Sequence, residues 1–301
     1  MAVKFDRSAE DFGNITGLEH TNVTVPDQLM ATVFYITGMA FTRDPYMVAG
    51  TWNMWVNIGR NQIHLPVDPN PQVFRGHTGL VVPSLDYQVK SLEAVKDDLA
   101  GTKFDFDRGN DRLDVMCPWG NEYRCYEPKA EYGPINLGMP YVEFNVPKGT
   151  AEGIARFYQN VFGGPSSVTK SNGSQVAEVN VGYHQRLFFR ETDDSLPEFD
   201  GHHFQIYLAD FSGPHKKLLD LGVISEESNQ YQYRVVDIVD PDNGDKLFEV
   251  EHEVRSMSHP LYGRPFINRN PIQTNRNYQP GHDDRSWTPA HDDPNDQLGG
   301  K

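Results

Sequence analysis

Cysteine is scarce in this chain, and so are the short motifs of several common enzyme classes. The 301 residues include two cysteines, Cys117 and Cys125. Two thiols do not make the disulfide framework of a small secreted domain, so we expect both to be reduced and structural. The sequence contains no phosphate-binding loop, no dinucleotide glycine fingerprint, no Gly-x-Ser-x-Gly elbow and no His-Glu-x-x-His motif. This argues against the enzyme classes that depend on those motifs.

Long apolar runs and an excess of basic residues are missing as well. No run approaches the roughly 20 apolar residues that span a bilayer, and the polar N-terminus lacks the apolar stretch of a secretory signal. Lysine and arginine number 27 against 42 aspartates and glutamates, which gives a formal net charge of -15. Such a surface repels phosphate backbones and anionic lipids. We therefore expect a cytoplasmic protein that binds a small molecule rather than a nucleic acid or a membrane.

What the sequence does contain is a short phrase that occurs four times. It reads HTNVTVP from His20, HTGLVVP from His77, YVEFNVP from Tyr141 and HFQIYLA from His203, at spacings of 57, 64 and 62 residues. Apolar residues alternate with other residues in each copy, which is typical of a strand with one buried face. A helical pattern follows each copy: the first is predicted to begin after an N-cap at Asp27, the third to end at Gly163-Gly164 and the fourth to end at Gly222. Further strand-like runs follow each helix. The repeating unit is therefore predicted to be β-α-β-β-β.

A stretch rich in turn-forming residues, 127–138, divides the chain into two halves. We predict an N-terminal domain over 1–132 and a C-terminal domain over 133–260, each built from two β-α-β-β-β modules. A tail rich in proline, asparagine and aspartate follows over 261–301. We expect that tail to be disordered or to wrap the surface, because it has few aliphatic side chains to bury. The predicted fold class is α+β.

Four such modules, with a histidine at the start of the first strand, resemble the vicinal-oxygen-chelate superfamily. This superfamily includes glyoxalases, bleomycin-resistance proteins and extradiol dioxygenases, and the resemblance covers about residues 17–255. It implies that paired modules curl into two half-open barrels of the glyoxalase/dioxygenase type. It also implies one divalent metal, held by side chains from the first and last strands of paired modules. A homodimer is a further expectation, since superfamily members often form one.

Mapping the resemblance onto this chain gives eight candidate ligand positions. The first strands supply His20, His77, Tyr141 and His203, and the last strands supply His64, Arg124, Leu187 and Glu249. If the first module pairs with the fourth, one site is the complete set His20, His64, His203 and Glu249, and the other is vacant. If it pairs with the second, Arg124 falls among the ligands. The first pairing is favoured, although both stay open. Glu251 is the reserve carboxylate, and Glu253 is expected to be solvated.

The resemblance implies a ring-cleaving dioxygenase of the extradiol or hydroquinone type, acting on a small aromatic diol in the catabolism of aromatic compounds. Two imidazoles and one carboxylate hold Fe(II) or Mn(II) and leave positions for substrate and dioxygen. His64, His202 and Tyr233 are the candidate catalytic residues, with His64 either an acid/base or a fourth ligand. A fourth ligand favours a glyoxalase-like lyase or isomerase, with zinc, nickel or cobalt as possible metals. The third possibility is a metal-free binding protein of the resistance type.

Overall fold

The computed structural model describes residues 5–44, 47 and 52–264. The predicted tail lies outside the described residues from position 265 onward. None of the described helices is long and apolar enough to cross a bilayer.

Each module is a strand, a helix and three further strands, as the repeat predicts. The first contains β1 (Ile15–Asn22), α1 (Gln28–Ala31) with its π-helical continuation η2 (Thr32–Gly38), β2 (Thr42–Arg43), β3 (Asn53–Ile58) and β4 (Asn61–Pro66). The second contains β5 (Gly76–Val81), α2 (Leu85–Ala94), β6 (Asp105–Arg108), β7 (Leu113–Met116) and β8 (Glu122–Tyr126). The third contains β9 (Gly138–Pro147), α3 (Ala151–Phe157) with η4 (Tyr158–Phe162), β10 (Ser166–Ser171), β11 (Ser174–Gly182) and β12 (Gln185–Thr192). The fourth contains β13 (His203–Leu208), α4 (Ser212–Leu221), β14 (Ile224–Asn229), β15 (Gln232–Val239) and β16 (Lys246–Ser256).

The predicted helix ends are confirmed at the residues that set them. Asp27 is the N-cap of α1, and its carboxylate accepts hydrogen bonds from the backbone N–H groups of Leu29 and Met30. These are two of the donors that a helix start leaves without a partner. At the other ends, Gly163 and Gly222 adopt the left-handed conformation that stops η4 and α4.

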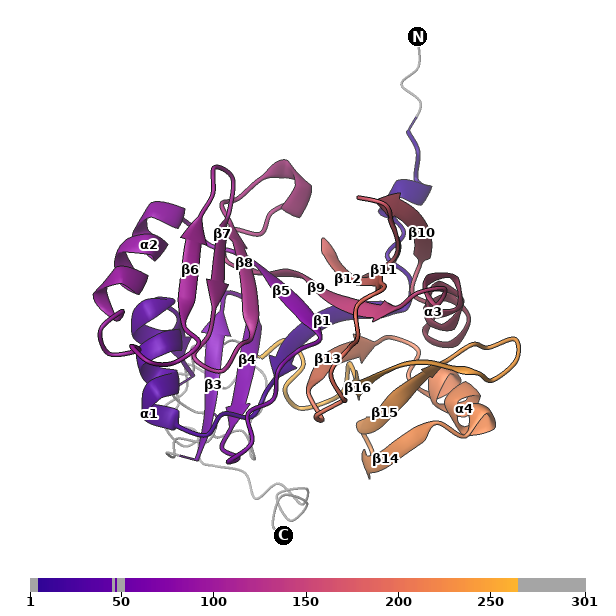
Figure 1. The fold of residues 1–301 in the computed structure, drawn as a ribbon. Helices are drawn as coiled ribbons and strands as arrows, with labels where there is room; N and C mark the ends of the chain where they lie inside the picture. The colour runs from indigo at the N-terminus through magenta and orange to yellow at the C-terminus, as the bar shows by residue number, and fades with distance from the viewer. Residues whose placement is uncertain (1–4, 45–46, 48–51, 265–301) are drawn as a thin grey trace, which may run out of the picture.

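The modules form two eight-stranded sheets, one from the first and fourth modules and one from the second and third (Figure 1). The strand order is β14-β15-β16-β13-β1-β4-β3-β2 in the first sheet and β10-β11-β12-β9-β5-β8-β7-β6 in the second. In each sheet the first strands of the paired modules lie antiparallel at the centre. Neither sheet closes on itself, as expected for half-open barrels. The predicted α+β class is confirmed, and so is the favoured module pairing.

The helices pair differently from the sheets: the helix of the first module packs on that of the second, and the helix of the third on that of the fourth. The amide of Gln88 in α2 donates to the carbonyl of Gly38 at the end of η2, and Lys217 of α4 donates to the carbonyl of Asn160 in η4. Figure 1 shows α1 beside α2 and α3 close to α4. The expected boundary near residue 132 therefore separates two helix pairs, whereas each sheet combines strands from both sides of it.

Candidate metal centre

Three of the predicted ligands converge on one face of the first sheet, which we call the inner face. His20 on β1, His64 on β4 and His203 on β13 each offer one ring nitrogen, and these atoms lie within 4.8 Å of one another. The register explains the meeting, because Asn22 pairs with His64 on one side and with His203 on the other. His20 lies two residues before Asn22 and so projects from the same face.

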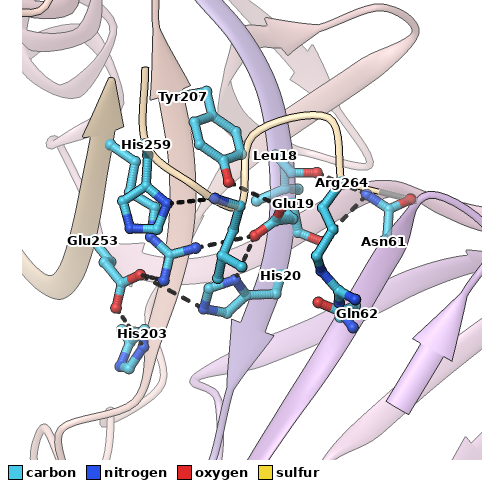
Figure 2. Close-up of polar contacts among 12 residues, drawn as sticks. Leu18, Glu19, His20, Asn61, Gln62, His203, Tyr207, Glu253, His259 and Arg264 are labelled. Atoms are coloured by element: carbon cyan, nitrogen blue, oxygen red, sulfur yellow. Dashed lines mark hydrogen bonds and ion pairs between the residues drawn. The ribbon is translucent and has the colours of Figure 1, made fainter. Parts of the chain in front are cut away.

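Glu253 is the carboxylate that joins these histidines. Its Oε1 lies 4.0 Å from Nε2 of His20, and its Oε2 lies 3.6 Å from Nε2 of His203. The pairing across the sheet runs from His20 to Gln205 on β13 and from Gln205 to Glu253 on β16. Figure 2 shows the side chains of His20, His203 and Glu253 turned toward one another.

Glu249, the carboxylate expected from the sequence, is not brought to the histidines. It lies four residues before Glu253 on β16, pairs in register with Asp237, and forms an ion pair with Lys246. Glu251, the reserve choice, contacts the other nitrogen of His203, with Oε2 3.1 Å from Nδ1. β16 runs from Lys246 to Ser256 because both of its neighbours pair with it, so all three glutamates lie on one strand.

His202 and Tyr233, two candidate catalytic residues, project from the opposite face. Nδ1 of His202 lies 2.6 Å from a carboxylate oxygen of Asp200, and its ring packs against Phe74. Tyr233 pairs with Val254 across the sheet, and its ring packs against Phe211. Neither side chain therefore faces His20 or His203.

His64 is held firmly on the inner face. Its ring stacks on Trp55 with 3.8 Å between centroids and 13° between planes. Its Nε2 lies 2.8 Å from Oδ1 of Asn53, which leaves Nδ1 as the nitrogen that can bind a metal. Burial lowers the pKa of His64 well below its ordinary value. The ring is therefore neutral at neutral pH, as a metal ligand must be.

Burial and neighbouring charges also set the protonation of His20 and Glu253. Burial lowers the pKa of His20, so that ring is neutral too. Burial alone would raise the pKa of Glu253, but Arg255, followed by His20, His203 and Arg234, outweighs it and holds the pKa well below its usual range. Arg255 lies 2.6 Å from Oε1 of Glu253, and Arg234 lies 2.5 Å from Oε2. Glu253 is therefore an ionised carboxylate with its orientation fixed.

Several buried polar atoms on the inner face have no hydrogen-bond partner among the described residues. They are Nε2 of His20, Nε2 of His203, Oδ1 of Asn22 and both amide atoms of Gln205. Leaving such an atom unsatisfied costs about 1–3 kcal/mol, so a cluster of them in one place indicates a missing polar ligand. Three imidazoles and one carboxylate are a donor set that suits a divalent transition metal. The residues present therefore fit the metal that the resemblance implies.

The residues after β16 cover one side of the site. Arg264 forms a buried ion pair with Asp44, with 2.7 Å between Nη2 and Oδ2. The same oxygen of Asp44 accepts a hydrogen bond from Gln62, the residue that pairs with His20 across β1 and β4. Leu261 packs with Trp55, the ring behind His64. Figure 2 shows this segment passing over the site.

The second sheet has a different set at the matching positions. Nε2 of His77 lies 3.2 Å from the hydroxyl of Tyr141. The Tyr141 ring lies across Gly79, where a Cβ atom would meet it at 2.1 Å. Arg124 lies beside Asp114, and Leu187 is buried in the core. Among the described residues, a cluster of three or more potential metal ligands occurs on the first sheet alone.

The comparisons with known proteins agree with this architecture. No family model matches the sequence, and no curated protein matches it by sequence. In fold the chain is similar to a candidate dioxygenase from Bacillus subtilis strain 168, with 12% identity and a TM-score of 0.58 over 87% of this chain and 89% of that one. It is also similar to a variant of glyoxalase I from Zea mays, with 12% identity and a TM-score of 0.58 over 81% of this chain and 94% of that one.

Glyoxalases and dioxygenases of this kind define the vicinal-oxygen-chelate architecture. The chain therefore has the vicinal-oxygen-chelate fold, and the predicted resemblance is confirmed at that level.

The first prediction concerns which carboxylate binds the metal. The wild-type protein purified without chelator should contain about one divalent metal ion per chain by elemental analysis. His203→Ala should lose this ion. Glu253→Gln should weaken the affinity for Co²⁺ by at least about 100-fold, since a ligand contributes no less than the 10–100-fold of an outer contact. Glu249→Gln is the matched control and should stay within about twofold. The opposite ranking of the two glutamate variants would refute the assignment of Glu253.

The second prediction concerns acid stability. Burial, followed by the charge of Arg124, lowers the pKa of His77 to about 4, whereas an unfolded histidine has a pKa near 6.5. Below pH 6.5 the unfolded chain binds a proton that the folded chain does not, so stability falls as the pH drops from about 6.5 toward 4. The free energy of unfolding of metal-free His77→Gln, measured in urea, should therefore fall by about 2 kcal/mol less than that of the wild type between pH 7.5 and 5. His215→Gln should follow the wild type, and equal losses in all three chains would contradict the prediction.

Proposed function

We propose that this chain is a divalent-metal enzyme that acts on a small substrate with two adjacent oxygen atoms. The observation that carries the proposal is the meeting of His20, His64, His203 and Glu253 on the inner face, where two buried imidazole nitrogens have no other partner. A divalent metal held there supplies Lewis-acid polarisation of the substrate oxygens. Homodimerisation, expected from the same resemblance, stays a prediction.

The number of protein ligands favours one of the two enzymatic candidates. Four protein ligands leave two positions of an octahedral ion, which are enough for the two oxygens of an enediolate. A chelated aromatic diol together with dioxygen needs three. The position of His64 beside His20 and His203 therefore favours a glyoxalase-like lyase or isomerase. The low pKa of His64 supports the same choice, because it makes this ring a poor proton donor at neutral pH.

Gln205 and Asn22 are the residues that would contact the substrate. Gln205 is fully buried between His20 and Glu253, and both its amide oxygen and its amide nitrogen are unpartnered. The amide can therefore donate to a carbonyl or enolate oxygen while it accepts from a hydroxyl. Asn22 offers a further acceptor from the next row of the sheet. This combination suits a hydroxycarbonyl compound, which carries both kinds of group.

A ring-cleaving dioxygenase acting on an aromatic diol is the second candidate. The observation that favours it is the hydrogen bond between His64 and Asn53. His64 thus has a protein partner for its Nε2, whereas the Nε2 atoms of His20 and His203 have none. If that bond holds His64 away from the metal, two imidazoles and one carboxylate remain, the ligand set of Fe(II) oxygenases.

The third prediction separates these reactions by the consequence of removing His64. Chain loaded with Ni²⁺, Co²⁺ or Zn²⁺ should exchange the proton on the hydroxyl-bearing carbon of hydroxycarbonyl compounds in D₂O, followed by NMR. His64→Ala should lower this rate by about 100-fold or more, because it removes a ligand. Oxygen uptake with catechols or hydroquinones by the Fe(II)-loaded chain, unaffected by His64→Ala, would instead establish the dioxygenase. A wild-type chain that binds no metal after reconstitution would refute both enzymes.

A further inference from the structure

His20 and His203 are two of the three described histidines whose Nε2 has no partner, the third being His202 on the opposite face. His20 and His203 share a second feature, which is a glutamate at the other ring nitrogen. Nδ1 of His20 lies 3.4 Å from Oε2 of Glu19, and Nδ1 of His203 lies 3.1 Å from Oε2 of Glu251. Glu251 occupies the same strand face as Glu253, as its position two residues earlier requires. Glu19 is less expected, because it is the immediate chain neighbour of the histidine that it contacts.

An irregularity in β1 brings Glu19 and His20 together. Consecutive side chains of a regular strand point to opposite faces, but the register of β1 against β13 shifts between Leu18 and His20. Such a bulge changes the direction of the side chains around it. The amide of Asn61 donates to the carbonyl of Leu18 at this point and fixes the backbone there.

The carboxylate of Glu19 is held by two further donors. The hydroxyl of Tyr207 donates to Oε1 at 3.0 Å, and Nη1 of Arg255 lies 3.2 Å from Oε2. Figure 2 shows Glu19 between Tyr207 and His20. Because Arg255 also contacts Glu253, one buried guanidinium connects the carboxylate behind His20 with the carboxylate in front of it.

These contacts decide where the proton of His20 lies. A neutral imidazole has one N–H group and one lone pair, and an ionised carboxylate can only accept. Carboxylates face both nitrogens of the ring, but Glu19 is the closer, 3.4 Å from Nδ1 against 4.0 Å between Glu253 and Nε2. The contact therefore favours the proton on Nδ1, which puts the lone pair on Nε2 toward Glu253 and His203. The opposite tautomer would direct an N–H group at the metal position and block binding.

We propose that Glu19 is a positioning residue that fixes the tautomer and ring orientation of His20 for metal binding, with Glu251 in the same role for His203. The role at the metal rests on the proposed function, whereas the tautomer of His20 is a property of the metal-free chain. Outer contacts of this kind typically change metal affinity by about 10–100-fold.

His202 and Asp200 provide a matched control. Their contact has the same form, with Nδ1 of His202 2.6 Å from a carboxylate oxygen of Asp200. His202 projects from the opposite face, away from the proposed ligands. Asp200→Ala therefore removes a carboxylate from an imidazole, as Glu19→Ala does, without touching the metal position.

The fourth prediction combines a tautomer measurement with a binding measurement at pH 7.5. In the ¹⁵N-labelled metal-free wild type, long-range proton–nitrogen NMR should show His20 protonated on Nδ1, the signal being assigned by its loss in His20→Gln. Glu19→Ala should bind Co²⁺ about 10–100-fold more weakly by calorimetry and should populate the other tautomer. Glu19→Gln keeps an acceptor oxygen for Nδ1 and should lose no more than about fivefold. Asp200→Ala should bind Co²⁺ within about twofold of wild type.

Two results would overturn the role of Glu19. One is a wild-type His20 that carries its proton on Nε2, and the other is a folded Glu19→Ala chain with wild-type affinity and tautomer. If Glu19→Ala fails to fold, the wild-type and Glu19→Gln spectra still decide. A wild type that binds no Co²⁺ would refute the metal centre itself, while the tautomer of the metal-free chain would still test whether Glu19 positions the ring.

Discussion

The candidate site depends on the antiparallel contact between β1 and β13 at the centre of the first sheet. This contact joins strands that are almost 200 positions apart in the sequence, and its register sets Asn22 opposite His203 and His20 opposite Gln205. The neighbours β4 and β16 then add His64 and Glu253 to the same face. A slip of one residue in any of these pairings would turn the whole set of one strand to the other face. The register is secured because the other face is filled with large apolar side chains, Phe204 and Ile206 among them.

Around the histidines the inner face carries an unusual amount of buried charge. Glu19, Glu251 and Glu253 alternate with Arg234 and Arg255 in one connected set of ion pairs. Taking such groups out of water costs several kcal/mol per ion, and the attraction between them does little more than offset this. The arrangement therefore contributes little to stability, and its physical effect is to fix orientation. Glu19 and Glu253 are each held at both carboxylate oxygens, and Glu251 is held at Oε2. The imidazoles that face these carboxylates therefore have one favourable geometry.

The two ways of dividing the chain have different physical origins. Helices pair within each half of the sequence, as the contacts of Gln88 with Gly38 and of Lys217 with Asn160 show. Sheets pair between the halves. Each module therefore buries its helix against a sequence neighbour and its first strand against a different module. The ligand positions of the two sheets are therefore independent, because no residue of the cluster on the first sheet comes from the second.

The sequence by itself determined the four modules, the α+β class, the helix ends at Asp27, Gly163 and Gly222, and the three histidines that converge. These follow from local rules, since strand periodicity, capping and the repeated phrase can each be read within a few residues. It pointed to Glu249, with Glu251 in reserve, and wrongly expected Glu253 to be solvated, whereas Glu253 is buried beside the histidines. The three glutamates lie on the same face of one strand and are equivalent in any local pattern. The sequence also placed His202 and Tyr233 at the site, although both point away from it, and gave no sign that Glu19 contacts His20. Only the tertiary structure decided these points, because they depend on strand register and on a bulge set by pairing between distant parts of the chain.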